Sequence, residues 1–209
     1  AKDGSVGKVS ENRFARADEG DDVLIRNLEA FLAKVDPSIS FGFYECPAPY
    51  KRVLTPAVMS FIADTGRFTF MKDTCCDADE IRRRLDILKG TSFGLYNANS
   101  ATLLETLRAG AAGFSGVMAN MHPELYVWLT EHPFHENAPM VQSALSVGAL
   151  IERQVYPVCA KYHLGAIEKL PITTFCRTRD ERELNATARK EVHALNDLMN
   201  DVYRRYCVD

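Results

Sequence analysis

The sequence has neither a strong excess of charge nor a long apolar run. Its 209 residues include 25 Lys and Arg against 28 Asp and Glu, which gives a net charge of −3. Nucleic-acid-binding domains usually carry a basic surface, so we expect no nucleic-acid partner. A membrane-spanning helix needs about 20 apolar residues, and no run approaches that length, so we expect no membrane partner. Residues 1–5 lack the apolar segment of a signal peptide, and we expect a cytoplasmic protein.

Several chemical signatures are missing as well. None of the 6 cysteines belongs to a CxxC pair or to a Cys/His spacing typical of a metal site, so the sequence predicts neither a disulfide framework nor a metal centre. Scattered cysteines in a charged chain are typical of reduced thiols in the cytosol. Cys75 and Cys76 are adjacent, and we interpret them as small residues after a strand rather than as a redox or metal pair. No GxGxxG or Walker A loop follows any predicted strand.

What the sequence does contain is an alternation of strand-like and helix-like segments. A helix is predicted over 20–35, and its end is followed by Pro37. Two later helices have clear starts, at Thr55 with Pro56 and at Asp77 with Glu80. Strands are predicted over 40–46, 68–73, 93–97 and about 112–117. The strand starts are roughly 20–28 residues apart, a spacing typical of parallel βα units.

After about residue 136 the strand pattern stops, and long helices are predicted over 138–164 and 180–207. We therefore predict an α/β region over 1–135 and a helical region over 136–209. Four parallel strands are too few for a closed (β/α)8 barrel, which needs about 250 residues. A small doubly wound sheet is the alternative, but the missing phosphate loops argue against it. We favour part of a barrel whose first strands are not in this chain, with no strand assigned to residues 1–19.

Lys72 is the first candidate catalytic residue. It lies near the carboxyl end of the segment 68–73, and period-two alternation predicts that Phe68, Phe70 and Lys72 share one face. Parallel α/β folds keep their active sites at the carboxyl ends of the strands. Exclusion of water there favours a neutral, nucleophilic amine. The alternative is a lysine that extends from the strand end into solvent or pairs with Asp73.

Tyr44 is the second candidate. It lies at the corresponding end of the preceding strand, on the same predicted face as Gly42 and Cys46. Gly42 leaves room beneath the ring, and a phenol beside an amine can donate and accept protons during imine formation. A single Tyr in a strand is often a core residue, so the pairing with Lys72 is what favours catalysis.

The loop after Tyr44 and the ends of the later strands supply candidate binding residues. Lys51 and Arg52 place positive charge beside the site and suit a substrate with a carboxylate. The alternative is a basic, solvent-exposed start of the next helix. Further substrate-binding candidates follow the strand ends: Glu45, Asn97, Asn99, Ser115 and Asn120. The asparagines are equally typical of helix caps.

Three motifs together resemble a known family. They are Tyr44 to Pro47, Phe70 to Asp73, and Gly113 to Asn120. They resemble the dihydrodipicolinate synthase and N-acetylneuraminate lyase family of pyruvate-type class I aldolases, which has Tyr-Asn-x-Pro on the fifth barrel strand and Lys followed by an acid on the sixth. The resemblance covers about residues 9–135, and the helical tail matches the three-helix appendage of such enzymes.

The resemblance implies the roles of two residues. Lys72 takes the place of the Schiff-base lysine, and Tyr44 takes the place of the tyrosine that relays protons and orients the ketoacid. It also implies a TIM (β/α)8 barrel from about strand 4 to helix 8, a 2-keto acid substrate such as pyruvate, a homodimer or homotetramer, and no metal or organic cofactor.

This chain departs from the family pattern in three ways. Phe14 lies near the place of the family's second tyrosine, Pro49 lies where synthases have an arginine, and the Thr-Thr motif of the first loops is not in the chain. The sequence therefore predicts a Schiff-base-forming lyase or aldolase of a dihydrodipicolinate synthase-like kind. Two alternatives stay open: a dehydratase for 2-keto sugar acids that uses the same lysine, and a non-catalytic paralogue that binds a small acid.

Overall fold

The computed structural model describes residues 6–208. Residues 1–5, on which the signal-peptide argument rests, and residue 209 lie outside the described part. The chain divides into two compact units, one formed by residues 6–99 and 105–115 and the other by residues 100–104 and 116–208. Within the described residues, none of the helices combines the length and hydropathy that a membrane span requires.

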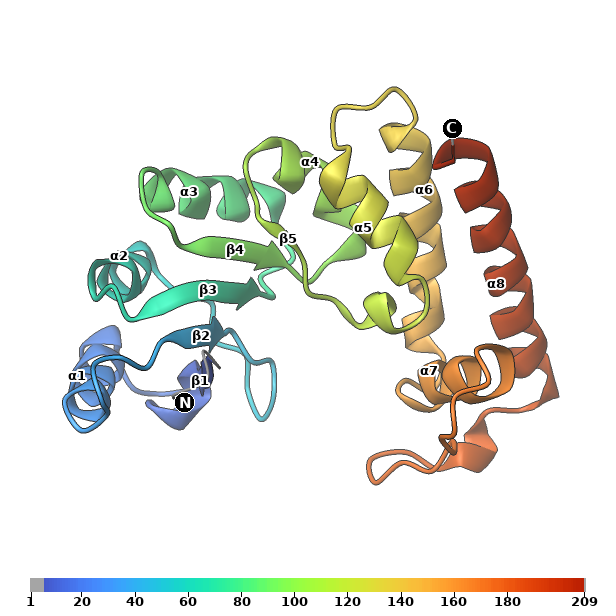
Figure 1. Cartoon of the computed structure of the whole chain (residues 1–209). Helices are drawn as coiled ribbons and strands as arrows, with labels where there is room; N and C mark the ends of the chain where they lie inside the picture. The colour runs from blue at the N-terminus through green and yellow to red at the C-terminus, as the bar shows by residue number, and fades with distance from the viewer. Residues whose placement is uncertain (1–5, 209) are drawn as a thin grey trace. The chain divides into compact units, whose positions relative to one another are not determined.

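The first unit is built on a five-stranded parallel sheet (Figure 1). Its strands are β1 (Gly7–Ser10), β2 (Phe41–Tyr44), β3 (Phe68–Asp73), β4 (Gly94–Asn97) and β5 (Gly113–Phe114). They lie in the sheet in the same order as in the sequence, and every neighbouring pair is parallel. A doubly wound sheet reverses its strand order at a switch point, whereas the wall of a (β/α)8 barrel does not. The topology is that of a barrel wall.

Two strands differ from the sequence prediction. The segment before residue 20 was expected to hold no strand, yet β1 pairs with β2 from Gly7↔Phe41 to Ser10↔Tyr44. Only Val9 of β1 is buried, so the segment has too little apolar alternation to be recognised locally. β5 has two residues rather than about six, because the chain turns into the 3₁₀ helix η3 (Val117–Asn120).

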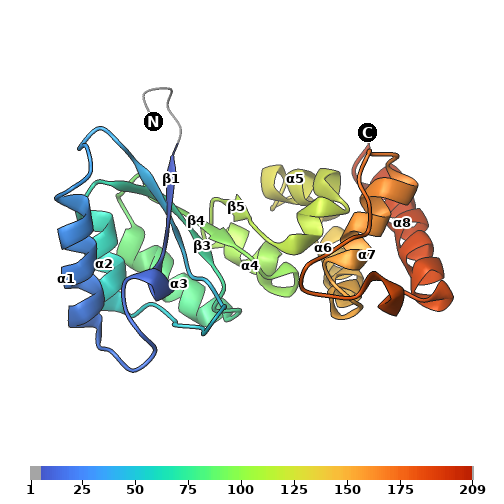
Figure 2. The same cartoon turned by 90° about the horizontal axis from the view of Figure 1, so that it is seen from below.

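Three helices cover one face of the sheet (Figures 1 and 2). They are α1 (Asp21–Leu32), α2 (Pro56–Asp64) and α3 (Ala78–Leu88). The predicted starts are confirmed: the Thr55 hydroxyl accepts the Val58 N–H at 3.4 Å, and the Asp77 carboxylate accepts two N–H groups at the start of α3. Such caps satisfy N–H groups that have no partner inside the helix.

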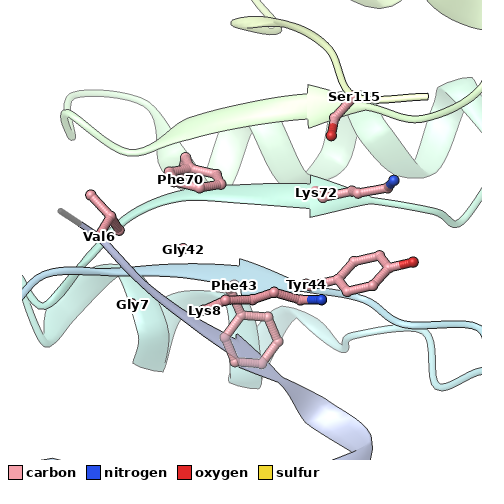
Figure 3. A pocket seen from close by; sticks show the side chains of 9 residues that line it. All are labelled: Val6, Gly7, Lys8, Gly42, Phe43, Tyr44, Phe70, Lys72 and Ser115. Atoms are coloured by element: carbon pink, nitrogen blue, oxygen red, sulfur yellow. The ribbon is translucent and has the colours of Figure 1, made fainter. Parts of the chain in front are cut away.

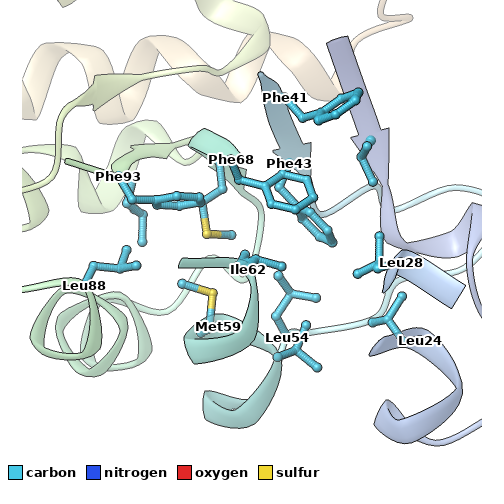
Figure 4. Packing of buried hydrophobic residues seen from close by; sticks show 14 of the residues in the cluster. Leu24, Leu28, Phe41, Phe43, Leu54, Met59, Ile62, Phe68, Leu88 and Phe93 are labelled. Atoms are coloured by element: carbon cyan, nitrogen blue, oxygen red, sulfur yellow. The ribbon is translucent and has the colours of Figure 1, made fainter. Parts of the chain in front are cut away.

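The main hydrophobic core of this unit lies between the three helices and the sheet (Figure 4). Its buried side chains come from the helices, the strands and the connections between them, and include Leu24, Leu28, Phe41, Phe43, Leu54, Met59, Ile62, Phe68, Leu88 and Phe93. Burying each such side chain contributes about 1.5–3 kcal/mol. Because this core takes one set of alternate strand residues, the other set faces the opposite side of the sheet.

An irregularity in β3 changes which residues share a face. Phe41 pairs with Phe68, but Gly42 pairs with Phe70, so the register shifts by one residue at this point. Phe68 therefore packs into the core against Phe43, with ring centroids 5.5 Å apart, while Phe70 lies on the other face. The expectation that Phe68 shares a face with Phe70 and Lys72 is wrong, because such an irregularity breaks the period-two alternation.

The second unit is helical. Its longer helices are α5 (Pro123–Glu131), α6 (Ala138–Gly148) and α8 (Ala186–Tyr206). The long helix expected over 138–164 is broken: α6 continues into the 3₁₀ helix η4 (Ala149–Arg153), and α7 (Val158–Tyr162) leads into a π-helical turn (His163–Ile167). Val155 has φ +51°, and Pro157 has no N–H to donate, so the helix does not continue through 154–157.

The remaining short helices follow strands or precede longer helices. η1 (Glu11–Arg13) follows β1, η2 (Ser100–Thr102) and α4 (Leu103–Arg108) follow β4, and η6 (Glu181–Glu183) precedes α8. Ser100 begins the 3₁₀ helix η2, and α4 follows it directly. The second predicted long helix, 180–207, is confirmed over most of its length as α8.

Candidate functional site

A cavity of about 430 Å³ lies on the face of the sheet opposite the main core (Figure 3). This volume is within the range of small-molecule sites. The residues that line it are Val6, Gly7, Lys8, Gly42, Phe43, Tyr44, Phe70, Lys72 and Ser115. They come from β1 and the residue before it, from β2 and β3, and from the segment after β5, so the sheet itself forms most of the wall.

Lys72 and Tyr44 are neighbours across the β2–β3 pair. Their Cα atoms are register partners, and the Lys72 Nζ lies 5.1 Å from the centroid of the Tyr44 ring. The two strands are parallel, as expected, and both residues lie near their carboxyl ends. Asp73, the next residue, is fully buried and lies outside the cavity lining. An amine and a phenol therefore meet at the edge of the sheet where barrel enzymes carry their sites.

Lys8 is a second ammonium group beside the same ring. It lies on β1, opposite Gly42, and its Nζ is 4.5 Å from the Tyr44 ring centroid. The Tyr44 ring thus has two cations within the distance of a cation–π contact. The sequence analysis missed Lys8 because β1 was not recognised as a strand. The sequence signal that was available is slight: Lys8 stands between the small Gly7 and the apolar, β-branched Val9.

Gly42 and Phe70 are register partners that line the cavity two residues before Tyr44 and Lys72. A Cβ atom built on Gly42 would lie 2.2 Å from Cζ of Phe70, so no larger residue fits there while the Phe70 ring keeps its place. The Phe70 ring in turn packs edge-on against Tyr96, with centroids 5.9 Å apart. The space beneath Tyr44 that the sequence analysis assigned to Gly42 is filled by an aromatic ring.

The strands that carry Tyr44 and Lys72 are tied together by Arg84 of α3. Its guanidinium donates to Asp73, to Glu45 at 2.9 Å and to the Leu54 carbonyl at 3.1 Å. All three charged side chains are at most 1% exposed. Burial opposes the charge of Arg84 most strongly, but the carboxylates of Asp73 and Glu45 outweigh it, so the pKa of Arg84 lies above its usual range. Sequence reasoning missed this arginine, which looked like one of three consecutive exposed residues.

Glu45, predicted to bind substrate, does not line the cavity and instead holds neighbouring segments of the backbone together. Its carboxylate accepts the N–H groups of Leu54 and Thr74, both at 2.9 Å, in addition to Arg84. The Thr74 hydroxyl also donates to the Glu45 carbonyl at 2.7 Å. Glu45 therefore fastens the end of β2 to the end of β3.

The two basic residues predicted to bind substrate do not line the cavity. Arg52 forms an ion pair with Asp21 at 2.8 Å and donates to the Glu19 carbonyl at 2.9 Å. Lys51 donates to the Cys75 carbonyl at 3.3 Å. Lys51 thus contacts the loop after β3, and Arg52 contacts the loop before α1 and the first residue of α1.

The remaining predicted residues are distributed between the cavity and the turns. Ser115 lines the cavity, and its N–H donates to the Asn97 carbonyl at 2.8 Å. Asn97 is fully buried, donates to the Thr106 hydroxyl and accepts the Asn99 N–H at 2.7 Å. Asn120, in the second unit, donates to the Val117 carbonyl at 2.8 Å within its own turn.

Phe14 and Glu11 follow β1, away from the cavity lining. The Phe14 ring packs edge-on against Phe31, with centroids 5.3 Å apart. Glu11 is completely buried, and one of its carboxylate oxygens accepts the Cys46 N–H at 2.9 Å. Burial raises the pKa of Glu11 to about 7. Sequence reasoning did not single out this carboxyl group.

Among residues 6–208, no three or more His, Cys, Asp and Glu side chains are grouped so that they could hold a metal ion.

Comparison with known proteins gives matches among solved structures. No protein-family model and no curated protein sequence matches the chain. Ruminococcus gnavus sialic acid aldolase superposes with a TM-score of 0.79 at 16% identity, over 97% of this chain and 68% of its own. Thermotoga maritima dihydrodipicolinate synthase gives 0.76 at 18%, over 95% and 68%. A prophage protein of the dihydrodipicolinic acid synthase family from E. coli K12, in complex with pyruvate, gives 0.71 at 20%, over 90% and 63%.

These matches extend over nearly the whole described chain, in both units, but over only about two thirds of the first two proteins. The open five-stranded wall and the helical region that follows are consistent with a barrel represented in part. The resemblance inferred from the sequence is therefore confirmed at the level of the fold: the chain is built like the dihydrodipicolinate synthase and sialic acid aldolase proteins, as an incomplete (β/α)8 barrel with a helical C-terminal appendage.

Proposed function

We propose that this chain carries the catalytic site of a lyase or aldolase that forms an imine with pyruvate or a related 2-keto acid. The observation that carries the proposal is the placement of the Lys72 amine beside the Tyr44 phenol in a cavity at the carboxyl ends of parallel strands. The structural matches support it, because they include a catalytic-lysine mutant of the R. gnavus aldolase and a pyruvate complex of the E. coli protein.

In this proposal the neutral amine of Lys72 attacks the C2 carbonyl carbon of the ketoacid. The carbonyl oxygen takes up a proton and leaves as water after a second proton transfer, so that a C=N bond replaces C=O. The protonated imine then accepts an electron pair when a bond at C3 breaks, either to a proton or to carbon. Hydrolysis returns the amine and releases the ketoacid.

Tyr44 is placed to serve the proton transfers of this sequence. Its phenol oxygen donates a proton to the leaving hydroxyl and takes one back when water attacks the imine. The Lys8 ammonium attracts the ring electrostatically, and Lys72 does so whenever it carries a proton or forms the protonated imine. The Phe70 ring lines the cavity beside Gly42 and packs edge-on against Tyr96, which lies outside the lining.

Deuterium exchange at the pyruvate methyl group tests the proposal without knowledge of any second substrate. An imine at Lys72 makes the C3 protons acidic, so we expect the protein to catalyse their exchange with D₂O, followed by proton NMR. The Lys72→Met variant should reduce the exchange to the buffer rate, whereas Lys89→Met, at an exposed helix end, should exchange at the wild-type rate. Wild-type exchange no faster than buffer would contradict the proposal.

A further inference from the structure

The cavity contains two positive side chains and no acidic one among its nine lining residues. Lys8 and Lys72 both line it. The carboxylates at the ends of the same strands lie outside the cavity lining: Asp73, the last residue of β3, and Glu45, just after β2, bind Arg84, and Glu11, just after β1, accepts the Cys46 N–H. The fold thus separates its charges, with the buried acids among the helix and loop contacts and the two ammonium groups in the cavity.

The backbone register explains how Lys8 reaches the proposed site. Lys8 is the register partner of Gly42, two residues before the Tyr44 and Lys72 pair, so its Cα lies one layer deeper in the sheet. Gly42 has no side chain to block the way, and the long lysine side chain extends along β2 until its Nζ lies beside the Tyr44 ring. Figure 3 shows the amino groups of Lys8 and Lys72 and the Tyr44 hydroxyl at the same end of the strands.

The charges present during the proposed reaction indicate what kind of ligand Lys8 would bind. A protonated imine at Lys72 carries one positive charge, which the C1 carboxylate of a bound 2-keto acid balances. Lys8 adds a second positive charge, and no acidic side chain lines the cavity to balance it. The Lys8 side chain is exposed to solvent, so its ammonium can reach a second negative group on the ligand and form a charge-assisted hydrogen bond with it.

We propose that the cavity is a site for a dianionic 2-keto acid, in which Lys8 binds a second carboxylate while Lys72 forms the imine. Lys8 is then the residue that sets the preference for a ketodicarboxylate over pyruvate. This inference rests on the proposed function for the role of Lys72, but the binding of the second carboxylate by Lys8 does not. The cavity volume of about 430 Å³ accommodates a small dicarboxylate.

Glutarate is a suitable probe, because it has two carboxylates and no keto group and so binds without forming an imine. Isothermal titration should detect glutarate binding to the wild-type protein. Lys8→Met should weaken it by about tenfold or more, the effect of one lost charge-assisted contact. Butyrate, which has a single carboxylate, should change by less than about threefold by the same reasoning. Lys89→Met removes the same charge from an exposed site and should leave glutarate binding unchanged.

Borohydride trapping of the imine at Lys72 is the second experiment that tests the role of Lys8. The concentration of 2-oxoglutarate that gives half-maximal labelling should rise about tenfold or more in Lys8→Met, while that of pyruvate stays within about threefold. Lys8→Arg keeps the charge and should retain the preference for 2-oxoglutarate. If Lys8→Met does not fold, a Lys8→Arg or Lys8→Gln variant with wild-type thermal stability takes its place, and only Gln should lose the preference.

The outcomes separate the two proposals. Glutarate binding that depends on Lys8, without any labelling of Lys72, keeps the anion site and removes the imine. Labelling of Lys72 with equal glutarate binding in wild type and Lys8→Met keeps the imine and removes the role of Lys8. No glutarate binding by the wild type, or ketoacid labelling at Lys8 in place of Lys72, overturns the inference.

Discussion

At the residue scale, the candidate site depends on one aromatic ring between two ammonium groups. Tyr44 has Lys8 at 4.5 Å and Lys72 at 5.1 Å from its ring centroid. A ring in this position contributes in two separable ways. Its π face attracts the cations, and its hydroxyl transfers protons. A phenylalanine keeps the first contribution and loses the second.

Tyr44→Phe should therefore slow deuterium exchange into pyruvate by roughly 10²–10⁴-fold, the usual contribution of a general acid–base group. The melting temperature should stay close to the wild-type value, because the ring and its packing remain. Tyr96→Phe is a matched control, since that ring packs on Phe70 and does not line the cavity. A Tyr44→Phe protein that exchanges as fast as the control would show that the Tyr44 hydroxyl has no part in proton transfer.

Glu11 predicts a specific pH dependence of stability. Its pKa is about 7 in the folded protein, because burial penalises the charged form, against an ordinary value of 4.5. Between those two values the folded state binds more protons than the unfolded state, so this group lowers the free energy of unfolding as pH rises from 4.5 to 7. Glu11→Gln keeps an acceptor for the Cys46 N–H and removes the charge.

Urea unfolding at pH 5.0 and pH 7.5 measures this effect. Relative to wild type, Glu11→Gln should gain stability at pH 7.5 more than at pH 5.0. Glu29→Gln, on the exposed side of α1, should show no such difference. An identical shift for Glu11→Gln at both pH values would contradict the raised pKa.

The sequence predicted some site residues and missed others for physical reasons. Tyr44 and Lys72 were recognisable because each ends an apolar strand at the same offset. Lys8 was not, because β1 has one buried residue and is held as a strand by its pairing with β2. Phe68 was placed on the wrong face because the register shift beside Thr69 depends on the neighbouring strand, which local alternation does not describe.

At the element scale, α3 holds the carboxyl ends of β2 and β3 through a single buried arginine. Arg84→Met leaves the carboxylates of Asp73 and Glu45 buried without their cation. Breaking a buried pair in this way costs about 3–5 kcal/mol, so we expect a loss of that order in urea unfolding. Arg83→Met removes an exposed arginine that pairs with Glu80 and should cost less than about 1 kcal/mol. Equal costs for the two variants would refute the structural role of Arg84.

Element boundaries were predictable where a local signal fixes them. The starts of α2 and α3 follow from Thr55 and Asp77, and their ends from Gly66 and Gly90, which have φ +62° and +83°. The break after α6 was not predicted, because the residues from 149 to 156 keep a helical apolar pattern. Val155 has φ +51°, a conformation that β-branched residues rarely adopt, so the residue type did not indicate the break.

At the scale of the whole molecule, the two units are expected to respond to acid in opposite directions. Glu11 makes the first unit less stable as pH rises toward neutrality. In the second unit, His122 and His163 are buried, with ring centroids 5.4 Å apart, and burial lowers both pKa values, that of His122 to about 3. The nearby Glu168 carboxylate opposes the shift at His163 without reversing it.

His122 contributes stability above its ordinary pKa of 6.5, and this contribution is lost as pH falls from 6.5 toward 3. The second unit should therefore loosen first on acidification. His122→Phe keeps a ring of similar size and removes the titration, so its advantage over wild type should be larger at pH 5.0 than at pH 7.5. Hydrogen exchange of α5 and α8 amides at the two pH values measures this. A wild-type second unit that is equally protected at both would disprove the prediction.

The fold class itself was predictable from the sequence. The spacing of strands and helices, with no phosphate loop, predicted a parallel βα arrangement, and the observed strand order β1 to β5 distinguishes a barrel wall from a doubly wound sheet. What the sequence did not indicate is the separation of charge between the cavity and the helix contacts, because it depends on which strand residues alternate into the core.

The most direct test of the central proposal is to locate the imine by mass spectrometry. The protein is incubated with pyruvate and borohydride, digested, and its peptides are sequenced. The account predicts one reduced pyruvate adduct per chain, on Lys72, which is absent from the Lys72→Met variant and present in Tyr44→Phe at a slower rate. An adduct on another lysine, or none on a folded wild-type protein, would contradict the proposed function.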